Sequence, residues 1–573
     1  MKKIYKTIIA LVMSVVAMSS VVACSGRDDD IETIDSSKTQ LEISNFNGGF
    51  GGEWLEIAKA RFEELYKDTS FEEGKVGVQV RITPTKDQGT ALADLMSTSG
   101  MHIYFTQGID YYDCVNRGLL ADITDVVTGS LSDYGENKTI ESKFNDQQKS
   151  FLKTSENKYY GIPHYASYDG IQYDVDLFEE KGFYFAADPN VDANTTKYNT
   201  WLDNGNNGFI MDKTDTRSNG PDGKPNTSDD GLPATYEEFY KLLDYIVDGG
   251  CTPFVWTGQF RSDYIKGLIS SLAVDYEGYD QMMLNYTFNG TATHLVKSID
   301  DNGNVTFEEP TQIDNTNGYM MLKSAGRYYG MSFYQQITSK STYYNSSCFN
   351  ETVSHLGAQQ EFLFSRPEAK KPIAMLAEGS YWVNESKDTF ATIAAQYDEE
   401  YSIMNRKLGM MPLPKVSEKQ IGEGQTVQDG LSSYCLINAT CTGVHLDLAK
   451  KFLKFVNTDE SLREFTVTTN SPKSLNYDLT ESDLEKLSYY GKCIWNIKET
   501  SDVVYPVSTN SIFMSNSHAL MYTMLIDVEQ YDPAADWLRG TNSSASKLSA
   551  SDYFFKLQNQ YGETWWKGLN SVS

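Results

Sequence analysis

A segment in the first half of the chain places oxygen-bearing side chains at the spacing of a calcium-binding loop. It fits the spacing of the pattern D-x-[DN]-x-[DN]-G-x5-E, with Asn226 and Ser228 lowering the charge of the ligands, Gly231 at the sharp turn and an acid at the twelfth position. The candidate ligands are Asn226, Ser228, Asp230 and Glu237, with Asp222 and Asp229 as alternates. The spacing predicts a structural Ca²⁺ that would brace this part of the chain.

The same segment can also be the start of a helix. Pro233 falls inside the loop, and Glu237 follows Thr235, where an acid in the first turn of a helix is favourable. Both interpretations of the segment stay open.

No motif in the sequence indicates catalysis. There is no G-x-S-x-G, no H-E-x-x-H and no Gly-rich phosphate loop, and the 6 histidines stand singly. A glycosidase would need two carboxylates facing each other across about 5–9 Å, and the 78 acidic residues single out no such pair. We therefore expect a binding protein that is not an enzyme and requires no cofactor, with a secreted glycosidase as the alternative.

The composition describes a globular protein with a strong negative charge. Of the 573 residues, 40% are hydrophobic and 22% are charged, and the mean hydropathy is −0.45. These values argue against a polytopic membrane protein. A formal charge of −29 would repel phosphodiester backbones, so nucleic acid is not an expected partner.

The amino terminus has the layout of a bacterial export signal. Three lysines precede an apolar run from Ile8 to Met18, which is shorter than the ~20 residues of a membrane-spanning helix. Val21-Val22-Ala23-Cys24 resembles a lipobox, so residues 1–23 are a predicted signal peptide and Cys24 a predicted lipidation site. This places the mature protein on the extracellular face of the cell membrane, anchored through Cys24, with residues 24–40 as a flexible tether. The alternative is a plain secretory signal.

The six remaining cysteines are scattered and include no C-x-x-C pair. This spacing gives no metal–thiolate site, and we expect mostly free thiols. Cys435 and Cys441 are the pair most suited to a disulfide.

The first part of the folded chain alternates strands and helices. Residues 41–43 and 76–82 alternate like strands, residues 53–66 and 87–97 have helical spacing, and residues 102–105 read as a short buried strand. Four glycines lie between the first strand and the first helix. This alternation predicts an α/β lobe.

Two stretches with few aliphatic residues interrupt the later pattern. They cover about 186–231 and 277–315, and we expect polar appendages there rather than a third core. Ile299 to Val305 has the composition of a hairpin turn, and Thr235 to Glu238 forms a capping box that opens a helix. Residues 550–569 are predicted to form one amphipathic helix.

A series of short motifs resembles the extracellular solute-binding protein family 1, which includes the maltodextrin-binding proteins. After LEISNFNGGFGGEWLEIAKARFEELY at 41–66, the motifs in family order are GLLADIT at 118–124, YGIP at 160–163, YDVDLF at 173–178, LPATYEEF at 232–239, TPF at 252–254, AMLAEGSYW at 374–382, GMMPLP at 409–414 and AKKFLKF at 449–455. Asp174 replaces the usual asparagine of the family motif.

This resemblance implies an α/β protein with the two-lobed, type II periplasmic-binding-protein fold, hinge crossings and two polar insertions. Lobe one would be residues 41–163 plus 432–503, and lobe two 164–431 plus 504–573, with crossings near Pro163, Gly430 and Tyr505. The lobes would close on a carbohydrate, which we expect to be an oligosaccharide, and deliver it to the permease of an ABC importer. We expect a monomer.

The resemblance also indicates where a sugar would bind. Sugars need flat apolar faces for ring C–H groups and polar side chains for hydroxyls. Trp382 stands where the family places a stacking aromatic, directly after Glu378 and Gly379. The predicted ligand-binding residues are Asn47, Phe50, Glu53, Gln107, Asp110, Tyr165, Tyr168, Asp169, Trp256, Gln259, Arg261, Asp263, Glu378, Trp382 and Tyr434.

A third class of protein is a surface glycan-binding lipoprotein of the starch-utilisation type, not coupled to a permease. Such proteins are built on helical repeat pairs, and this chain has no ~34-residue period.

Overall fold

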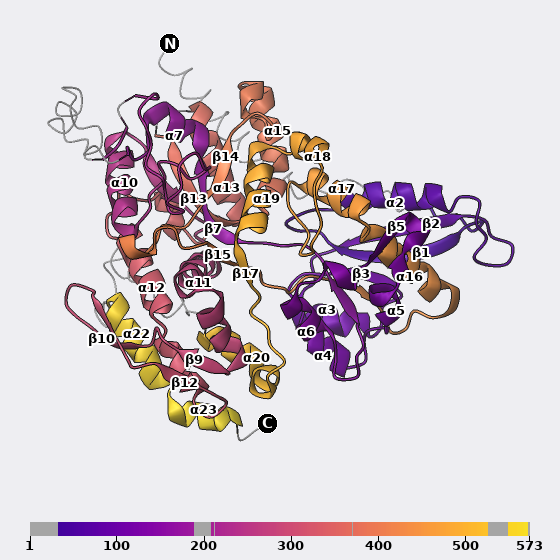
Figure 1. Cartoon of the computed structure of the whole chain (residues 1–573). Coiled ribbons are helices and arrows are strands. Elements are labelled where there is room, and N and C mark those ends of the chain that lie inside the picture. The colour runs from indigo at the N-terminus through magenta and orange to yellow at the C-terminus, as the bar shows by residue number, and fades with distance from the viewer. Residues whose placement is uncertain (1–32, 188–207, 211, 369–370, 525–547, 571–573) are drawn as a thin grey trace, which may run out of the picture.

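Figure 1 shows the computed structural model, in which helices and strands form two lobes side by side. The structure describes residues 33–187, 208–210, 212–368, 371–524 and 548–570. The predicted signal peptide, Cys24 and much of the stretch from 186 to 207 lie outside these ranges. No helix within them is both long enough and apolar enough to span a bilayer.

Lobe one is built on a five-stranded sheet with the order β2-β1-β3-β16-β6. Strands β1 to β3 run parallel, and β16 inserts antiparallel between β3 and β6. The strands are β1 (Thr39–Phe46), β2 (Val78–Thr85), β3 (Ile103–Phe105), β6 (Gly161–Pro163) and β16 (Tyr434–Ile437). Because β1 and β3 are parallel, the loops that follow them meet at one edge of the sheet, where open α/β sheets bind ligands.

The helices of lobe one pack around this sheet. They are α2 (Glu53–Leu65), α3 (Gly89–Met96), α4 (Tyr111–Asn116), α5 (Thr124–Thr128), α6 (Asp146–Leu152), α16 (Gly443–Val456), α17 (Asp459–Thr469) and α18 (Glu481–Lys486). Helix α2 buries Trp54, Leu55, Ala58 and Phe62 on one face, which confirms the helical spacing seen in the sequence. The predicted strands and helices of the first 105 residues are all present.

Lobe two is built on a four-stranded sheet with the order β14-β7-β13-β8. Its central strand β13 pairs antiparallel with β7 and parallel with β8. The strands are β7 (Asp169–Asp174), β8 (Thr252–Val255), β13 (Ile373–Gly379) and β14 (Leu408–Met411). The amino end of β7 therefore lies beside the carboxyl end of β13, with Asp169 opposite Gly379.

The helices of lobe two begin and end at recognisable signals. Thr235 accepts a hydrogen bond from the backbone N–H of Glu238 at the start of α10, and Gly182, at φ 70°, ends α7. The helices are α7 (Val175–Lys181), α10 (Tyr236–Asp248), α11 (Arg261–Thr287), α12 (Ala325–Ile337), α13 (His355–Glu368), α14 (Trp382–Glu385) and α15 (Lys387–Gln396).

Helix α19 (Tyr489–Thr500) lies between the two cores. Tyr490 and Ile494 are buried in the core of lobe two, whereas the ring of Trp495 lies 5.3 Å from that of Tyr477 in lobe one. Strand β17 (Asp502–Val504), which follows α19, pairs with β15 (Thr426–Gln428), which precedes the second crossing. The chain thus joins lobe two before Tyr505, earlier than the family layout suggested.

The second insertion forms part of a third hydrophobic core, so the expectation of polar appendages was wrong for it. Helix α11 extends into the insertion through a break at Gly278, and two antiparallel pairs follow it. These strands are β9 (Gly290–Ala292), β10 (Val296–Ile299), β11 (Val305–Phe307) and β12 (Thr311–Ile313). Phe288, Leu295 and Ile313 are buried there with Trp566. A few widely spaced apolar residues suffice because helices from the end of the chain complete the core.

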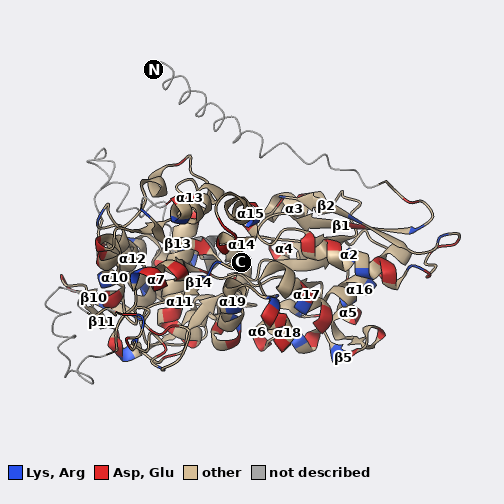
Figure 2. Cartoon of the chain, turned by 90° about the horizontal axis from the view of Figure 1, so that it is seen from above, with Lys and Arg blue, Asp and Glu red and all other residues tan. Residues whose placement is uncertain are grey.

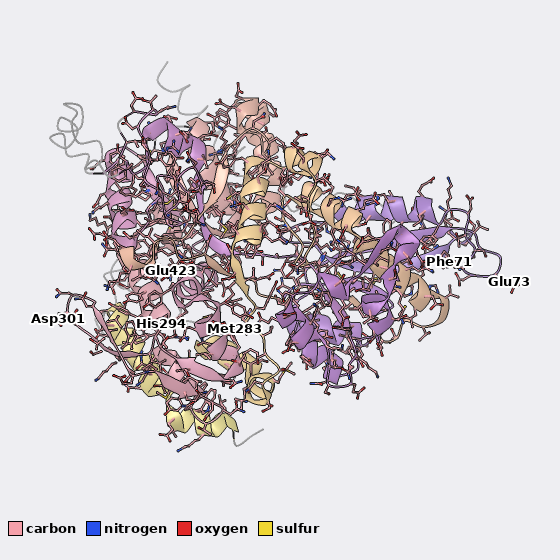
Figure 3. All side chains as sticks on the ribbon, viewed as in Figure 1. Phe71, Glu73, Met283, His294, Asp301 and Glu423 are labelled. Carbon is pink, nitrogen blue, oxygen red and sulfur yellow. The ribbon has the colours of Figure 1, made fainter. Side chains whose placement is uncertain are left out.

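Those helices are α20 (Ser511–Met524), α22 (Ala550–Gln560) and α23 (Glu563–Asn570), which lie together at the lower edge of lobe two in Figure 1. The single helix predicted over 550–569 is therefore two helices. The predicted hairpin turn is confirmed, with the Asp300 N–H donating to the Asn304 carbonyl at 3.1 Å. Figure 3 labels Asp301 at the tip of this hairpin.

The six cysteines beyond residue 24 are all free thiols, which confirms the expectation of free thiols. The suggested Cys435–Cys441 disulfide is absent, because Cys435 is on β16 inside the core of lobe one.

We predict that the third core is part of the cooperative fold. Trp566 is fully buried, and its indole N–H donates to the Asn315 carbonyl at 2.9 Å. Replacing Trp566 with alanine should lower the free energy of unfolding by ~3–5 kcal/mol, as measured by urea titration. The exposed neighbour Lys567 is the control, and Lys567→Ala should change stability by under ~1 kcal/mol. Equal stability of the two variants would contradict the third core.

Candidate ligand-binding cleft

The loop after β1 contacts lobe two. Phe50 in this loop packs against Tyr165, with ring centroids 4.3 Å apart, and lies 6.4 Å from Tyr381 of lobe two. Gly49 has φ +48°, and a Cβ added there would lie 3.5 Å from the Cβ of Tyr381. The glycine-rich loop thus brings the backbone of lobe one close to an aromatic side chain of lobe two.

Polar contacts join the lobes along the same edge. Lys387 forms an ion pair with Glu53, and the Asn384 amide donates to the Thr469 carbonyl at 2.6 Å. Glu385 accepts a hydrogen bond from the backbone N–H of Gly49. These contacts join the two lobes along the edge that holds the Phe50 loop.

A cavity of about 550 Å³ lies between lobe one, the second chain crossing and α20. Asp110 and Tyr112 line it from lobe one, Ser432 from the crossing, and Met514 and Ser517 from α20. Its volume falls in the range of small-molecule sites, about 300–1,000 Å³.

The floor between this cavity and the Phe50 loop is polar. The Tyr165 hydroxyl donates to the side-chain oxygen of Gln107, which follows β3. Tyr165 also hydrogen bonds with Ser433, and burial raises the pKa of its hydroxyl. Gln107 directly precedes the cavity-lining residue Gly108, and Ser433 directly follows the cavity-lining residue Ser432. The floor therefore connects the cavity to the Phe50 loop.

Carboxylates and tyrosines form the wall contributed by lobe two. Glu378 at the end of β13 is buried, and loss of solvent raises the pKa of its carboxyl well above the ordinary value. The Asp169 side chain is exposed to solvent, but protein surrounds the space that it faces. This loss of surrounding water raises the pKa of its carboxyl to about 6. Tyr264 hydrogen bonds with Tyr381. Loss of solvent, together with the nearby Glu378 and Asp169 carboxylates, raises the pKa of both hydroxyls.

A single amide links two of the acids. The Gln359 side chain donates to Glu378 at 3.2 Å and to Glu385 at 2.8 Å, and its own oxygen accepts from Ser386 at 2.7 Å. Burial also raises the pKa of Glu385. The two carboxyl groups are thus fixed in place at the edge where lobe two meets Gly49.

The structure brings together most of the residues that the sequence indicated. Phe50, Gln107, Tyr165, Asp169 and Glu378 lie along the floor and walls, and Asp110 and Tyr434 line the cavity. Tyr434 contributes only its ring, because it is 1% exposed and its hydroxyl bonds to the Leu431 carbonyl. Glu53 belongs to the contacts that join the lobes, and Asn47 is exposed in the loop.

The residues after β8 have mixed environments. Gln259 and Asp263 are exposed, whereas the guanidinium of Arg261 lies 4.9 Å above the ring of Phe349.

Three predicted aromatic residues are core residues, and the structure corrects their assignment. Trp382 is fully buried, with the rings of Phe362, Phe390 and Tyr490 within 6 Å, so neither of its faces can stack on a sugar. Trp256 is fully buried as well, and Tyr168 is 2% exposed. Their side chains point into lobe two.

The sequence analysis missed Tyr381, Tyr264, Glu385 and Gln359. Tyr381 directly precedes Trp382. The motif therefore indicated the correct part of the chain, but the sequence analysis chose the wrong one of two adjacent aromatic residues as the one that faces the cleft. Tyr264 directly follows Asp263 at the start of α11. Glu385 and Gln359 carried no signal, because they lie on different helices, α14 and α13, and meet only in the folded chain.

The calcium-loop geometry is not formed at Glu237. Its carboxylate points away into solvent and pairs with Lys241 at 2.9 Å, as expected for an acid in the first turn of a helix. Asp230 accepts the backbone N–H of Asn226, and Asp229 accepts that of Asp222 and the hydroxyl of Thr227. Ser228 lies in the turn between Asn226 and Asp230. Within the described ranges, no group of three or more His, Cys, Asp or Glu side chains is placed to hold a metal ion.

Solved structures share this fold. The chain is similar to a chitin oligosaccharide binding protein, with a TM-score of 0.53 and 16% identity, covering 91% of this chain and 99% of that one. It is also similar to RafE in complex with raffinose, with a TM-score of 0.50 and 14% identity, covering 91% and 100%. A structure from work on xylan utilization by Caldanaerobius polysaccharolyticus has a TM-score of 0.51 and 13% identity, covering 91% and 100%.

These similarities confirm the two-lobed α/β solute-binding fold predicted from the motifs. No family model matches the sequence. No curated protein matches it either.

We predict that Trp382 supports the fold and that Tyr381 faces the ligand. Trp382→Ala should lower the free energy of unfolding by ~3–5 kcal/mol, because it leaves a large cavity among three rings. Tyr381→Ala removes a half-buried ring and should cost less than half as much. Urea titration of the two variants measures this difference, and a smaller loss for Trp382→Ala would contradict the assignment.

Proposed function

We propose that this protein is a family 1 solute receptor that captures an oligosaccharide between its lobes and delivers it to the permease of an ABC importer. The observation that carries the proposal is the meeting of Phe50 and Tyr165 with Tyr381 and Asp169 across the interlobe edge. Aromatic faces and fixed carboxylates on opposite lobes are the groups that a sugar needs on its two sides.

The chemistry of each side follows from its residues. The half-buried ring of Tyr381 offers apolar surface to sugar C–H groups, and Phe50, which is 6% exposed, packs beside it and supports the floor. Asp169, Gln107 and the tyrosine hydroxyls offer hydrogen-bond partners to sugar hydroxyls. A cavity of about 550 Å³ beside this floor leaves room for more than one sugar ring.

The named neighbours support a carbohydrate cargo. One is named for chitin oligosaccharide and another is in complex with raffinose. Both are binding proteins, which supports a receptor rather than an enzyme. Coupling to a permease is proposed because lobe closure presents a different surface in the loaded state, which a membrane partner can recognise.

The proposed location follows from the amino terminus. Lipidation at Cys24 after removal of residues 1–23 would hold the receptor beside its permease on the extracellular face of the membrane. We propose that the receptor is a monomer, because one chain supplies both lobes that capture the sugar. Figure 2 shows acidic residues spread over both lobes, which fits a chain with a charge of −29 that does not bind nucleic acid.

The proposal is tested by thermal unfolding of residues 27–573 with a panel of sugars, peptides and calcium. A sugar at a hundredfold excess over its dissociation constant should add ~2.7 kcal/mol of stability and raise the melting temperature. Phe50→Ala should abolish this increase at the same sugar concentration, because it removes the ring nearest Tyr165.

Tyr397→Ala is the matched control, because Tyr397 is an aromatic residue of lobe two that is 45% exposed and lies outside the cleft residues. This variant should keep the full increase. A response to peptides alone would contradict a carbohydrate cargo. A rise with calcium alone would contradict it as well.

A further inference from the structure

The wall of lobe two contains a carboxylate with no protein partner. Among the residues that the structure describes, none donates a hydrogen bond to the Asp169 carboxylate or forms an ion pair with it, although its backbone carbonyl accepts from Ser271 at 2.7 Å. A Cβ at position 267 would lie 2.6 Å from its Oδ2, so Gly267 provides the space that this carboxylate occupies. Asp169 is thus held in place and remains open to solvent in the cleft.

Two more acids and two rings surround this carboxylate. Glu378 and Glu385 are held by Gln359, and Glu378 lies close enough to Asp169 for the two to affect each other's ionisation. Tyr381 and Tyr264 lie beside all three acids. The wall therefore combines carboxylates with tyrosine faces, and both attract cations.

Basic groups near this wall are engaged elsewhere. Lys387 pairs with Glu53 of lobe one, and the guanidinium of Arg261 lies over Phe349. His355 lies 3.9 Å from Glu385 and stacks on Tyr264, on the side of α13. Among the described residues, His355 is thus the basic group that lies against a wall acid, and no basic side chain forms an ion pair with Asp169.

On the basis of the proposed sugar-binding function, we propose that this wall selects sugars with a positively charged amino group over N-acetylated and uronic sugars. Asp169 is the residue that determines this specificity, through a charge-assisted hydrogen bond to the sugar ammonium. The faces of Tyr264 and Tyr381 add cation–π attraction, whereas a uronic carboxylate would meet repulsion from the Asp169 carboxylate.

Isothermal titration calorimetry at pH 7 tests the proposal on residues 27–573. The ligands are a glucosamine disaccharide, its N-acetylated counterpart and a galacturonic acid disaccharide. A hydrogen bond to a charged group contributes about 1.5–3 kcal/mol, so the amino sugar should bind at least ~10-fold more tightly than the N-acetylated sugar. The uronic sugar should bind more weakly than either.

Asp169→Asn keeps the shape of the side chain and removes its charge. It should reduce the preference for the amino sugar to under ~3-fold, because the amino sugar alone loses a charge-assisted hydrogen bond. Asp68→Asn, an exposed acid of lobe one, makes the same change of charge far from the cleft and should preserve the preference.

The preference should also depend on pH. Enclosure raises the pKa of Asp169 to about 6, so its carboxyl is mostly ionised at pH 7 and mostly neutral at pH 5. Burial also raises the pKa of Glu378 and Glu385, which face Asp169 from β13 and α14, and it raises the pKa of the Tyr264 and Tyr381 hydroxyls, which stay protonated. Lowering the pH to 5 should therefore reduce the preference toward that of Asp169→Asn.

The outcomes separate this inference from the function on which it rests. Equal affinity for the amino and N-acetylated sugars, or a preference that survives in Asp169→Asn, would overturn the specificity and leave sugar capture intact. Tight binding of the uronic sugar would overturn it too. If no sugar of the wider panel binds, both the receptor function and this specificity are wrong.

Discussion

The arrangement of the two lobes depends on a buried lysine where the chain segments cross. Lys473 is fully buried, and its amine lies 2.7 Å from Nδ1 of His164 at the first crossing. It also lies 4.8 Å from the ring centroid of Trp54 and 4.7 Å from that of Phe465. Loss of solvent lowers its pKa to about 8, and these ring and imidazole contacts offset part of the cost of burial. Because Trp54 follows the Phe50 loop, the same lysine supports both the crossing and the cleft floor.

The backbone around this lysine continues the same link. The His164 N–H donates to Ser433 of the second crossing, and the His164 carbonyl accepts from Ser474. Asp429 accepts the hydroxyl of Ser474 at 2.9 Å, and burial raises its pKa to about 7. Figure 3 labels Met283 on the side of lobe two that faces lobe one, where the Gln147 amide lies 3.3 Å from its sulfur. We expect these bonds to hold as a hinge while the contacts at the mouth of the cleft form and break.

The sequence was sufficient for the fold and for part of the cleft, and the reason is physical. Local periodicity determines elements such as α2, and the order of short motifs indicated the two-lobed layout. Gln107 was found because it follows the carboxyl end of β3, and Asp169 was found because it follows the first chain crossing. The choice between Tyr381 and Trp382 was not accessible, because it depends on which ring the three-dimensional packing turns inward. The third core was missed because its residues come from separated segments that join only in the folded chain.

The central claim is that a sugar closes the lobes about this hinge, and a distance between the lobes tests it most directly. Spin labels can be placed at Glu73 and Asp301, which are exposed at the far tips of lobe one and lobe two (Figure 3). Pulsed electron paramagnetic resonance then measures their separation with and without the sugar that stabilises the protein. The account predicts a broad distribution for the free protein that becomes a single narrow one, at a changed mean distance, when sugar is added. An unchanged distribution at saturating sugar would contradict closure.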